Sequence, residues 1–371
     1  MHPPRARDDC TALGPELIGL GRSRGLAAVG IAPAGVFNST RADLLERRAR
    51  GLHGGMQFTY RNPARSTDPG RLLPGARALV VGAWGYRRAD EPEPDRDPEH
   101  SGTSGAVARY ARSDHYDRLR EALRPVADRL REAGWRAVVV CDDNALVDRA
   151  AAHRAGLGWF GKNSLILLPG LGSWFVLGSV VTDAPLPPSL ADEPAAPGAG
   201  CGSCDRCRSA CPTGALVEPG VLDARRCLAW LVQTTGTFPE EYRRALGGRI
   251  YGCDECQQVC PINRLADRHH RPPPAEAGAV SAVDLVAMLD SSDQDLLATY
   301  GRWYVPARDP RYLRRNALVA LGNVGDPDHP ATIRCLRHWM GAGDELLAEH
   351  ARWAARALGL DTEGPGPSGD R

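Results

Sequence analysis

Lysine is almost absent from this chain. The 46 basic residues include a single lysine, Lys162, in the segment Gly158–Ser164, and all the others are arginine. A bias toward arginine explains the others, and one remaining lysine can fall anywhere by chance. The alternative is a tight site that needs a compact ammonium, which a planar guanidinium does not replace. The sequence leaves both interpretations open.

Long apolar runs and a secretory signal are also missing. No apolar run approaches the roughly 18 residues that a membrane-spanning helix requires. Met1–Cys10 is polar and lacks the apolar centre of a secretory signal. The formal net charge of +1 indicates no class of partner by itself. We therefore expect a cytoplasmic protein with no membrane partner. No G-x-G-x-x-G segment follows a strand, which argues against a dinucleotide-binding fold.

Cysteine, by contrast, is concentrated between residues 201 and 261. One run has the spacing C-x2-C-x2-C-x3-C-P, a second has C-x2-C-x3-C-P, and one cysteine lies between them. The eight residues are Cys201, Cys204, Cys207, Cys211, Cys227, Cys253, Cys256 and Cys260. Two [4Fe–4S] clusters need eight thiolates, because each iron takes one cysteine sulfur. The spacing therefore predicts two such clusters.

The same spacing suggests which thiol belongs to which cluster. In two-cluster bacterial ferredoxins, the cysteine before proline ligates the other cluster. One cluster is thereby assigned Cys201, Cys204, Cys207 and Cys260. The other is assigned Cys211, Cys253, Cys256 and, by elimination, Cys227. Zinc favours two separated C-x2-C pairs, and disulfides need an oxidising compartment, so neither alternative fits as well.

The first half of the chain alternates between predicted strands and helices. The expected strands are Ala27–Ile31, Ala78–Ala83, Ala137–Cys141, Leu165–Leu168 and Trp174–Thr182. The expected helices cover residues 43–51, 116–133 and 146–155, and residues 87–105 are expected to form a loop. This alternation over 12–183 indicates one α/β or α+β domain.

Proline-rich breaks at 184–200 and 272–274 divide the rest of the chain. We predict an α+β protein with an α/β-type domain over 12–183 and a ferredoxin-like two-cluster module with its linker over 184–271. A helical region over 272–360 follows, in which residues 281–300 are expected to be helical. Residues 361–371 are expected to form a disordered tail. Residues 315–322 recur as 352–359, with a period typical of HEAT repeats. Two ordinary amphipathic helices explain so short a match equally well.

Two further features are open to more than one interpretation. Asp142 directly follows the strand Ala137–Cys141, at the end where α/β sheets place their sites. Alternatively, Asp142 and its two neighbours merely cap the following helix. Arginines and aromatic residues alternate over Arg302–Arg315, which suits a folded RNA with a splayed loop. A solvated helix face in an arginine-rich protein has the same composition.

Several segments, taken in order, resemble the epoxyqueuosine reductase family over roughly residues 15–360. They are Ala108–Ala111, Ala155–Ser164, Cys201–Cys211, Cys227–Gly236 with Gln233-Thr234, and Tyr251–Pro261. The resemblance implies a cobalamin-dependent enzyme, supplied with electrons by two [4Fe–4S] clusters. Such an enzyme removes the epoxide oxygen of epoxyqueuosine at the tRNA wobble position, the last step of queuosine synthesis. Its partners are tRNA carrying epoxyqueuosine and an unidentified reductant, and we expect a monomer.

The resemblance also implies roles for particular residues. Asp142 matches the proton donor, and a carboxylic acid with a raised pKa can protonate an epoxide oxygen near neutral pH. Cobalamin contacts are expected at Arg65, Ala108, Asp142, Lys162, Asn163, Ile166 and Gln233. Near Asp142 a common proline is Ala145 here, and a common glutamate is Asp148. The chain lacks the D-x-H-x-x-G arrangement of one cobalamin class, consistent with cobalamin bound without a protein histidine.

Three other functions remain as alternatives. The cobalamin-dependent reductive dehalogenases share the general plan and act on small molecules, but the missing export signal argues against them. A non-enzymatic iron–sulfur electron carrier would bind no cobalamin. An iron–sulfur protein that binds RNA without turnover would keep the clusters and lack the chemistry.

Overall fold

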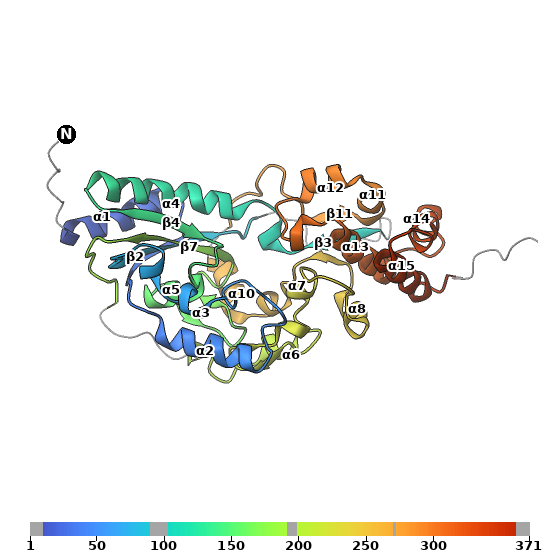
Figure 1. The fold of residues 1–371 in the computed structure, drawn as a ribbon, viewed down its shortest axis with the longest axis horizontal. Helices are drawn as coiled ribbons and strands as arrows, with labels where there is room; N and C mark the ends of the chain where they lie inside the picture. Colours follow the sequence, from blue (N-terminus) through green and yellow to red (C-terminus); the bar gives the residue numbers. More distant parts are fainter. Residues whose placement is uncertain (1–9, 90–102, 191–198, 270–271, 361–371) are drawn as a thin grey trace, which may run out of the picture. The chain divides into compact units, whose positions relative to one another are not determined.

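The computed structural model describes residues 10–89, 103–190, 199–269 and 272–360 (Figure 1). These residues form two compact units that interleave along the chain. Unit 1 takes its described residues from 10–89, 114–225 and 255–274, and unit 2 from 103–113, 226–254 and 275–360. The three successive domains expected from the sequence stay a prediction. The expected tail and residues 191–198 of the expected linker lie outside the described residues.

A four-stranded sheet forms the centre of unit 1. Its order is β1 (Ala28–Pro33), β2 (Ala78–Gly85), β7 (Phe175–Thr182) and β4 (Ala137–Cys141). Every neighbouring pair is antiparallel. These strands occupy four of the five segments expected from their apolar runs. The antiparallel pairing corrects the α/β-type interpretation of this region, and the mixed α+β class holds.

Helices cover both faces of this sheet. In Figure 1, α1 (Cys10–Ser23) and α4 (His115–Glu132) lie on one side and α5 (Asp148–Arg154) on the other. Gly82 and Gly178 are paired across β2 and β7, and a Cβ on either would lie 3.0–3.1 Å from Leu123 of α4. The missing side chains let α4 pack closely on the strands. Alternate residues such as Val81 and Val181 join the core beneath α5.

The remaining elements of unit 1 are short and surround the sheet. The helices are α2 (Asn38–Ala49), α3 (Pro63–Ser66), α6 (Arg206–Ser209), α9 (Glu255–Gln258) and α10 (Pro261–His269). The hairpins pair β5 (Trp159–Phe160) with β6 (Ile166–Leu167) and β8 (Leu216–Glu218) with β9 (Val221–Leu222). Short α6 and α9 each lie within a cysteine run, where a C-x2-C spacing leaves room for a single turn.

Unit 2 has a smaller sheet and most of the helices. Its strand order is β10 (Arg249–Tyr251), β3 (Ser104–Val107) and β11 (Ala282–Asp284). Its helices are α7 (Leu228–Leu231), α8 (Glu240–Leu246), α11 (Leu285–Asp290), α12 (Asp293–Tyr300), α13 (Arg311–Val324), α14 (Pro330–Met340) and α15 (Glu345–Ala357). None of these three strands was expected, and β10 lies within the expected cluster module. β3 begins inside the expected loop 87–105, of which 90–102 is not described, and β11 lies where helix was expected.

The two copies of the C-terminal repeat lie against each other in unit 2. A Cβ added to Gly322 of α13 would lie 2.6 Å from the Cα of Ala354 in α15. The two helices therefore approach closely and share one apolar core. Whether they form a true HEAT repeat stays a prediction. No helix in the described ranges is long and apolar enough to cross a membrane.

Candidate functional site: cysteines, a strained aspartate and the loop between them

The cysteines expected to hold the first cluster all belong to unit 1. Burial and the neighbouring thiols of Cys201 and Cys260 raise the pKa of Cys207 to about 11. These three thiols are therefore close enough to repel one another's charge. Such a group favours a bound cation or cluster, because metal binding replaces the thiol protons.

The alternatives to iron–sulfur ligation were a disulfide and a zinc site. No disulfide joins any two cysteines among the described residues. Within the described residues, no group of three or more His, Cys, Asp or Glu side chains is placed to hold one metal ion. A cubane spreads its cysteines over four irons, so its thiols need not converge on one point. The Sγ of Cys211 already accepts a hydrogen bond from the backbone N–H of Ala215 at 3.2 Å.

The four cysteines expected to hold the second cluster are divided between the two units. Cys211 and Cys256 belong to unit 1, and Cys227 and Cys253 belong to unit 2. Cys227 directly precedes α7, and Cys253 follows β10. The assignment of these four thiols to one cluster stays a prediction.

Asp142 follows the last residue of β4 and adopts a left-handed backbone conformation, with φ of 52°. This conformation costs an L-residue about 1–2 kcal/mol. Its neighbours form the local turn: Oδ1 of Asp143 accepts from the N–H of Ala145 at 2.7 Å, and Oδ1 of Asn144 accepts from the N–H of Thr59 at 3.0 Å. Helix α5 begins after Val147 without a side-chain cap. Asp142 is therefore not a helix cap, and its carboxyl group is left available.

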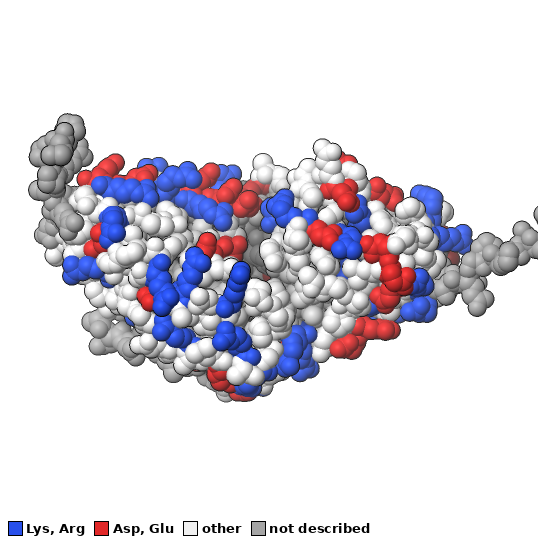
Figure 2. All heavy atoms as spheres, in the orientation of Figure 1, with Lys and Arg blue, Asp and Glu red and all other residues white. Residues whose placement is uncertain are grey.

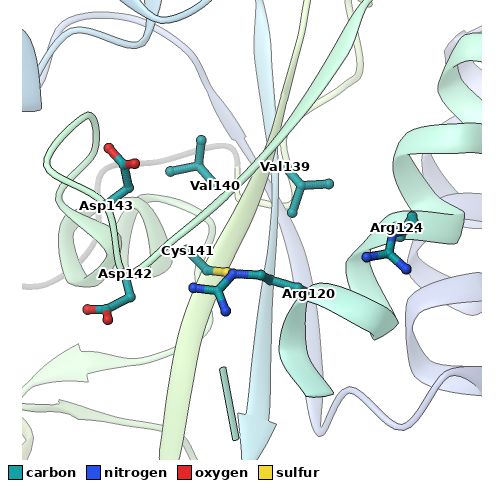
Figure 3. Close-up of a pocket in the computed structure, with 7 residues that line it drawn as sticks. All are labelled: Arg120, Arg124, Val139, Val140, Cys141, Asp142 and Asp143. Carbon is teal, nitrogen blue, oxygen red and sulfur yellow. The ribbon is translucent and has the colours of Figure 1, made fainter. Parts of the chain in front are cut away.

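The carboxyl group of Asp142 lines a cavity of about 300 Å³ beside β4 and α4. Figure 3 shows Asp142, Asp143 and the guanidinium of Arg120 at this cavity, with the carboxyl groups of both aspartates directed away from Arg120. Burial by the surrounding walls raises the pKa of Asp142, Arg120 opposes the shift, and Asp143 adds to it. A raised pKa keeps more of the carboxyl group protonated, as a general acid requires.

Asp148 and Tyr116 extend this acidic group, and the sequence pattern indicated no role for either. Oδ1 of Asp148 is buried and has no hydrogen-bond partner among the described residues. Burial, and then the charge of Asp142, raise the pKa of Asp148 well above its ordinary value. Burial, followed by the charges of Asp142 and Asp148, likewise raises the pKa of Tyr116. The sequence offered one signal for Asp148: it is an acidic residue six positions after Asp142, at the start of a helix.

The loop between β5 and β6 joins these acids to the cysteine segment. The carbonyl of Ser164 accepts a hydrogen bond from Arg149 at 2.7 Å. Nζ of Lys162 lies 3.1 Å from Asp205, which stands between two cysteines of the first run. Nδ2 of Asn163 donates to the carbonyl of Cys256 at 3.5 Å. Lys162 therefore has a definite structural partner, and its expected cobalamin contact stays a prediction.

The other expected cobalamin residues are distributed over both units. In unit 1, Arg65 lies in α3, where its N–H donates to Oδ1 of Asn62, and Ile166 is buried in β6. In unit 2, Ala108 donates its N–H to the carbonyl of Tyr251, and the side chain of Gln233 donates to the carbonyl of Ala229. Their meeting around one ligand stays a prediction.

The arginine-rich stretch Arg302–Arg315 is only partly exposed, with Tyr304 60% exposed, and its contact with RNA stays a prediction. Arg315 is fully buried, Arg314 is 7% exposed, and Trp303 is 3% exposed. Arg311 is more exposed but pairs with Asp309 and with an acid of α15's cap. In Figure 2, basic side chains gather instead over α2 and α3, whereas the C-terminal helices carry both signs.

Arg315 has a structural task in unit 2. It donates hydrogen bonds to the carbonyls of Leu231, Thr234 and Gly236 at 2.7–3.1 Å. Asn316 donates to the carbonyl of Val232 at 2.8 Å. Together these side chains hold the segment that contains Gln233.

Comparison with known families agrees with the arrangement of these residues. Residues 66–143 match the family described as "Epoxyqueuosine reductase QueG, DUF1730", and residues 200–263 match the "4Fe-4S double cluster binding domain". A curated epoxyqueuosine reductase of Xanthomonas campestris pv. campestris is 35% identical over 96% of this chain and 99% of its own length. One of Vibrio cholerae is 36% identical over 82% of this chain and 81% of its own.

Solved structures of epoxyqueuosine reductases have the same fold. One, crystallised with an epoxyqueuosine-modified tRNA-Tyr stem loop, is 32% identical and covers 95% of this chain and 91% of its own, with a TM-score of 0.82. A Bacillus subtilis structure, with its catalytic aspartate loop swung out of the active site, is 32% identical with a TM-score of 0.81, over 94% of this chain and 91% of its own.

Proposed function

This chain belongs to the epoxyqueuosine reductase family, and we propose that it reduces the epoxide of epoxyqueuosine in tRNA to give queuosine. The observation that carries the proposal is the carboxyl group of Asp142, which has no hydrogen-bond partner among the described residues. It stands in a strained turn, in a cavity that raises its pKa, within a chain that carries a double-cluster cysteine module. The relative crystallised with a modified tRNA stem loop supports the choice of substrate.

The reaction needs two electrons and two protons, and the epoxide oxygen leaves as water while a carbon–carbon double bond forms. The cysteine module would hold two [4Fe–4S] clusters, which transfer one electron at a time. Cobalamin, implied by the family resemblance, would supply the reductive chemistry at the epoxide carbon. The described residues fit a bound cobalamin in one respect. The carboxyl group of Asp142 has no partner among them, so it would be available to protonate the substrate.

Asp142 donates its carboxyl proton to the epoxide oxygen in this proposal. In the B. subtilis relative a catalytic aspartate loop has swung out of the active site, and Asp142 is the aspartate in a strained turn here. Burial raises the pKa of Asp142 against the opposing charge of Arg120, so Asp142 is more easily kept protonated. Arg149, held by Ser164, fixes the loop on the other side.

The remaining roles are proposals of the same kind. The cobalamin contacts would be formed by Arg65, Ala108, Asp142, Lys162, Asn163, Ile166 and Gln233. The eight cysteines would divide between the clusters as their spacing indicates. A monomeric state, a cytoplasmic location and the identity of the reductant stay predictions.

The test is anaerobic reconstitution with iron, sulfide and cobalamin, followed by nucleoside analysis of tRNA that carries epoxyqueuosine. Asp142→Asn keeps nearly the same shape but removes the acid. Single-turnover conversion should fall by roughly 10²–10⁴-fold, the contribution of a positioned acid. Cluster content and binding of cobalamin and tRNA should be unchanged.

Asp143→Asn is the matched control, because Asn can still accept the hydrogen bond from Ala145. It should retain most of the activity. A near-normal rate for Asp142→Asn would remove that residue from the mechanism. Wild-type protein that binds no cobalamin when offered it would favour the electron-carrier alternative.

A further inference from the structure

A basic cavity lies beside the cysteines of the first predicted cluster, and nothing in the proposed reaction uses it. Its volume is about 590 Å³. The lining residues are Asp205, Arg206, Ser209, Ala210, Val259 and Arg264. They come from α6 and its two cap residues, from the residues between α9 and α10, and from α10, all within unit 1. Arg206 directly precedes Cys207, and Val259 directly precedes Cys260, so the cavity adjoins two expected cluster ligands.

The charge of this surface is unbalanced. Asp205 is already paired with Lys162 and with Arg208. Arg206 and Arg264 are exposed, and neither has a carboxylate partner in the part of the chain that the structure describes; Arg264 only donates to the carbonyl of Gln258. Asp205, the acidic residue that lines the cavity, is therefore neutralised by Lys162 and Arg208. The two lining arginines face solvent and have no carboxylate partner among the described residues.

Apolar residues complete the surface. Ala210 and Val259 line the cavity, and Leu265 of α10, next to Arg264, is 44% exposed. No aromatic residue lines the cavity. A small apolar centre with charged residues around it is typical of a protein-docking site. A site for single-stranded RNA would be expected to offer aromatic stacking platforms.

We propose that this surface docks a small acidic protein that carries one electron and delivers it to the cluster of Cys201, Cys204, Cys207 and Cys260. The inference rests on the proposed function, because it names the kind of reductant that the reaction needs. Electron transfer becomes rapidly slower with distance, and this cavity is formed by neighbours of two ligands. An acidic partner matches the unpaired arginines and would be attracted to them over a longer range.

The electron balance sets how often the carrier must bind. Each encounter oxidises one carrier by one electron and reduces the cluster by one electron. Deoxygenation of one epoxide consumes two electrons and two protons and releases one water. Two encounters are therefore needed for each turnover, which favours a partner that binds quickly and leaves quickly, as a charge-steered complex does.

The test reverses two charges in the reconstituted holoenzyme, in the variant Arg206→Glu/Arg264→Glu. Photoreduced flavodoxin serves as the acidic carrier, and reduced methyl viologen serves as a small reductant that needs no docking site. The apparent KM for flavodoxin should rise roughly 10- to 100-fold at low salt. The difference from wild type should shrink as salt is added, because salt screens exposed charges. Turnover with methyl viologen and affinity for tRNA should match wild type.

Arg22→Glu/Arg24→Glu is the matched control. These two arginines are also exposed and unpaired within the described residues of unit 1, but they lie at the end of α1, outside the cysteine runs. The control should leave the KM for flavodoxin unchanged. Equal KM values for both double variants and wild type would overturn the docking proposal. Loss of tRNA affinity in Arg206→Glu/Arg264→Glu would overturn it too, by assigning the surface to RNA.

A second measurement separates this inference from the proposed function. The rate at which flavodoxin bleaches the cluster absorbance can be followed in stopped flow without any tRNA. If wild type fails to convert epoxyqueuosine with either reductant, the proposed function fails. The bleaching rate of Arg206→Glu/Arg264→Glu, compared with wild type, still decides the docking site.

Discussion

Replacing Arg315 with methionine should destabilise unit 2 far more than a change at its neighbour Arg311. Arg315 is fully buried, and no carboxylate is paired with it among the described residues. Burial lowers its pKa to about 10, so the guanidinium stays charged at neutral pH. The positive charge of Arg315 is instead compensated by hydrogen bonds to the backbone carbonyls of Leu231, Thr234 and Gly236.

The loss can be worked out from these carbonyls. A buried acceptor that loses its only donor costs about 1–3 kcal/mol, and two acceptors lose theirs here: the carbonyl of the half-buried Thr234 and Oδ1 of the buried Asn316. The carbonyl of Leu231 still accepts from the hydroxyl of Thr234 at 2.9 Å. The carbonyl of Gly236 belongs to an exposed residue and can bind water instead. Arg315→Met should therefore cost about 2–6 kcal/mol in total. This is a large share of the roughly 5–15 kcal/mol that stabilises an ordinary domain.

Urea unfolding and hydrogen–deuterium exchange of the peptide over residues 228–236 would measure the effect. Arg315→Met should lower the urea midpoint and remove protection from this peptide, and cobalamin binding should weaken if Gln233 is a contact. Arg311→Met is the control, since its ion pairs are solvent-exposed and such pairs contribute little. Wild-type protection in Arg315→Met, or an equal loss in Arg311→Met, would refute the reasoning.

Two further predictions concern the clusters and the acidic group. Cys227→Ala should reduce the iron content from about eight atoms to about four, because only the second cluster loses a ligand; retention of eight irons with an unchanged paramagnetic spectrum would show that Cys227 is not the fourth ligand. Asp148→Asn should raise the melting temperature at neutral pH. The raised pKa of Asp148 means that the folded chain binds this proton more tightly than the unfolded chain, so wild-type stability falls as pH rises from about 4 toward the raised value. The advantage of the variant should grow over that range and vanish in acid, and a melting-temperature difference that ignores pH would contradict the assignment.

Local features of this protein could be predicted from its sequence. The cysteine spacing alone indicates two clusters, because ligation depends on short separations along one chain, and the double-cluster match at 200–263 confirms the iron–sulfur part. The apolar runs at 78–83 and 137–141 formed strands as expected, since a run of buried β-branched and aliphatic residues needs no distant partner to be recognised. Asp142 was singled out by its place after such a run.

Contacts between distant residues decided the rest. Nothing in the order of residues specified that β4 would pair antiparallel with β7, which removed the parallel-sheet argument for Asp142 and left its strained turn and free carboxyl group as the better one. The composition of its segment suggested that Arg315 lies on the surface. Its guanidinium instead donates a hydrogen bond, from inside a core, to the carbonyl of Thr234, which is 81 residues away. Asp148 became notable only when burial left one of its carboxylate oxygens without a partner among the described residues. Composition and spacing indicate which metals or clusters a chain can ligate. The burial of a side chain and the partner of a strand depend on which distant segments pack together, and only the tertiary structure decides that.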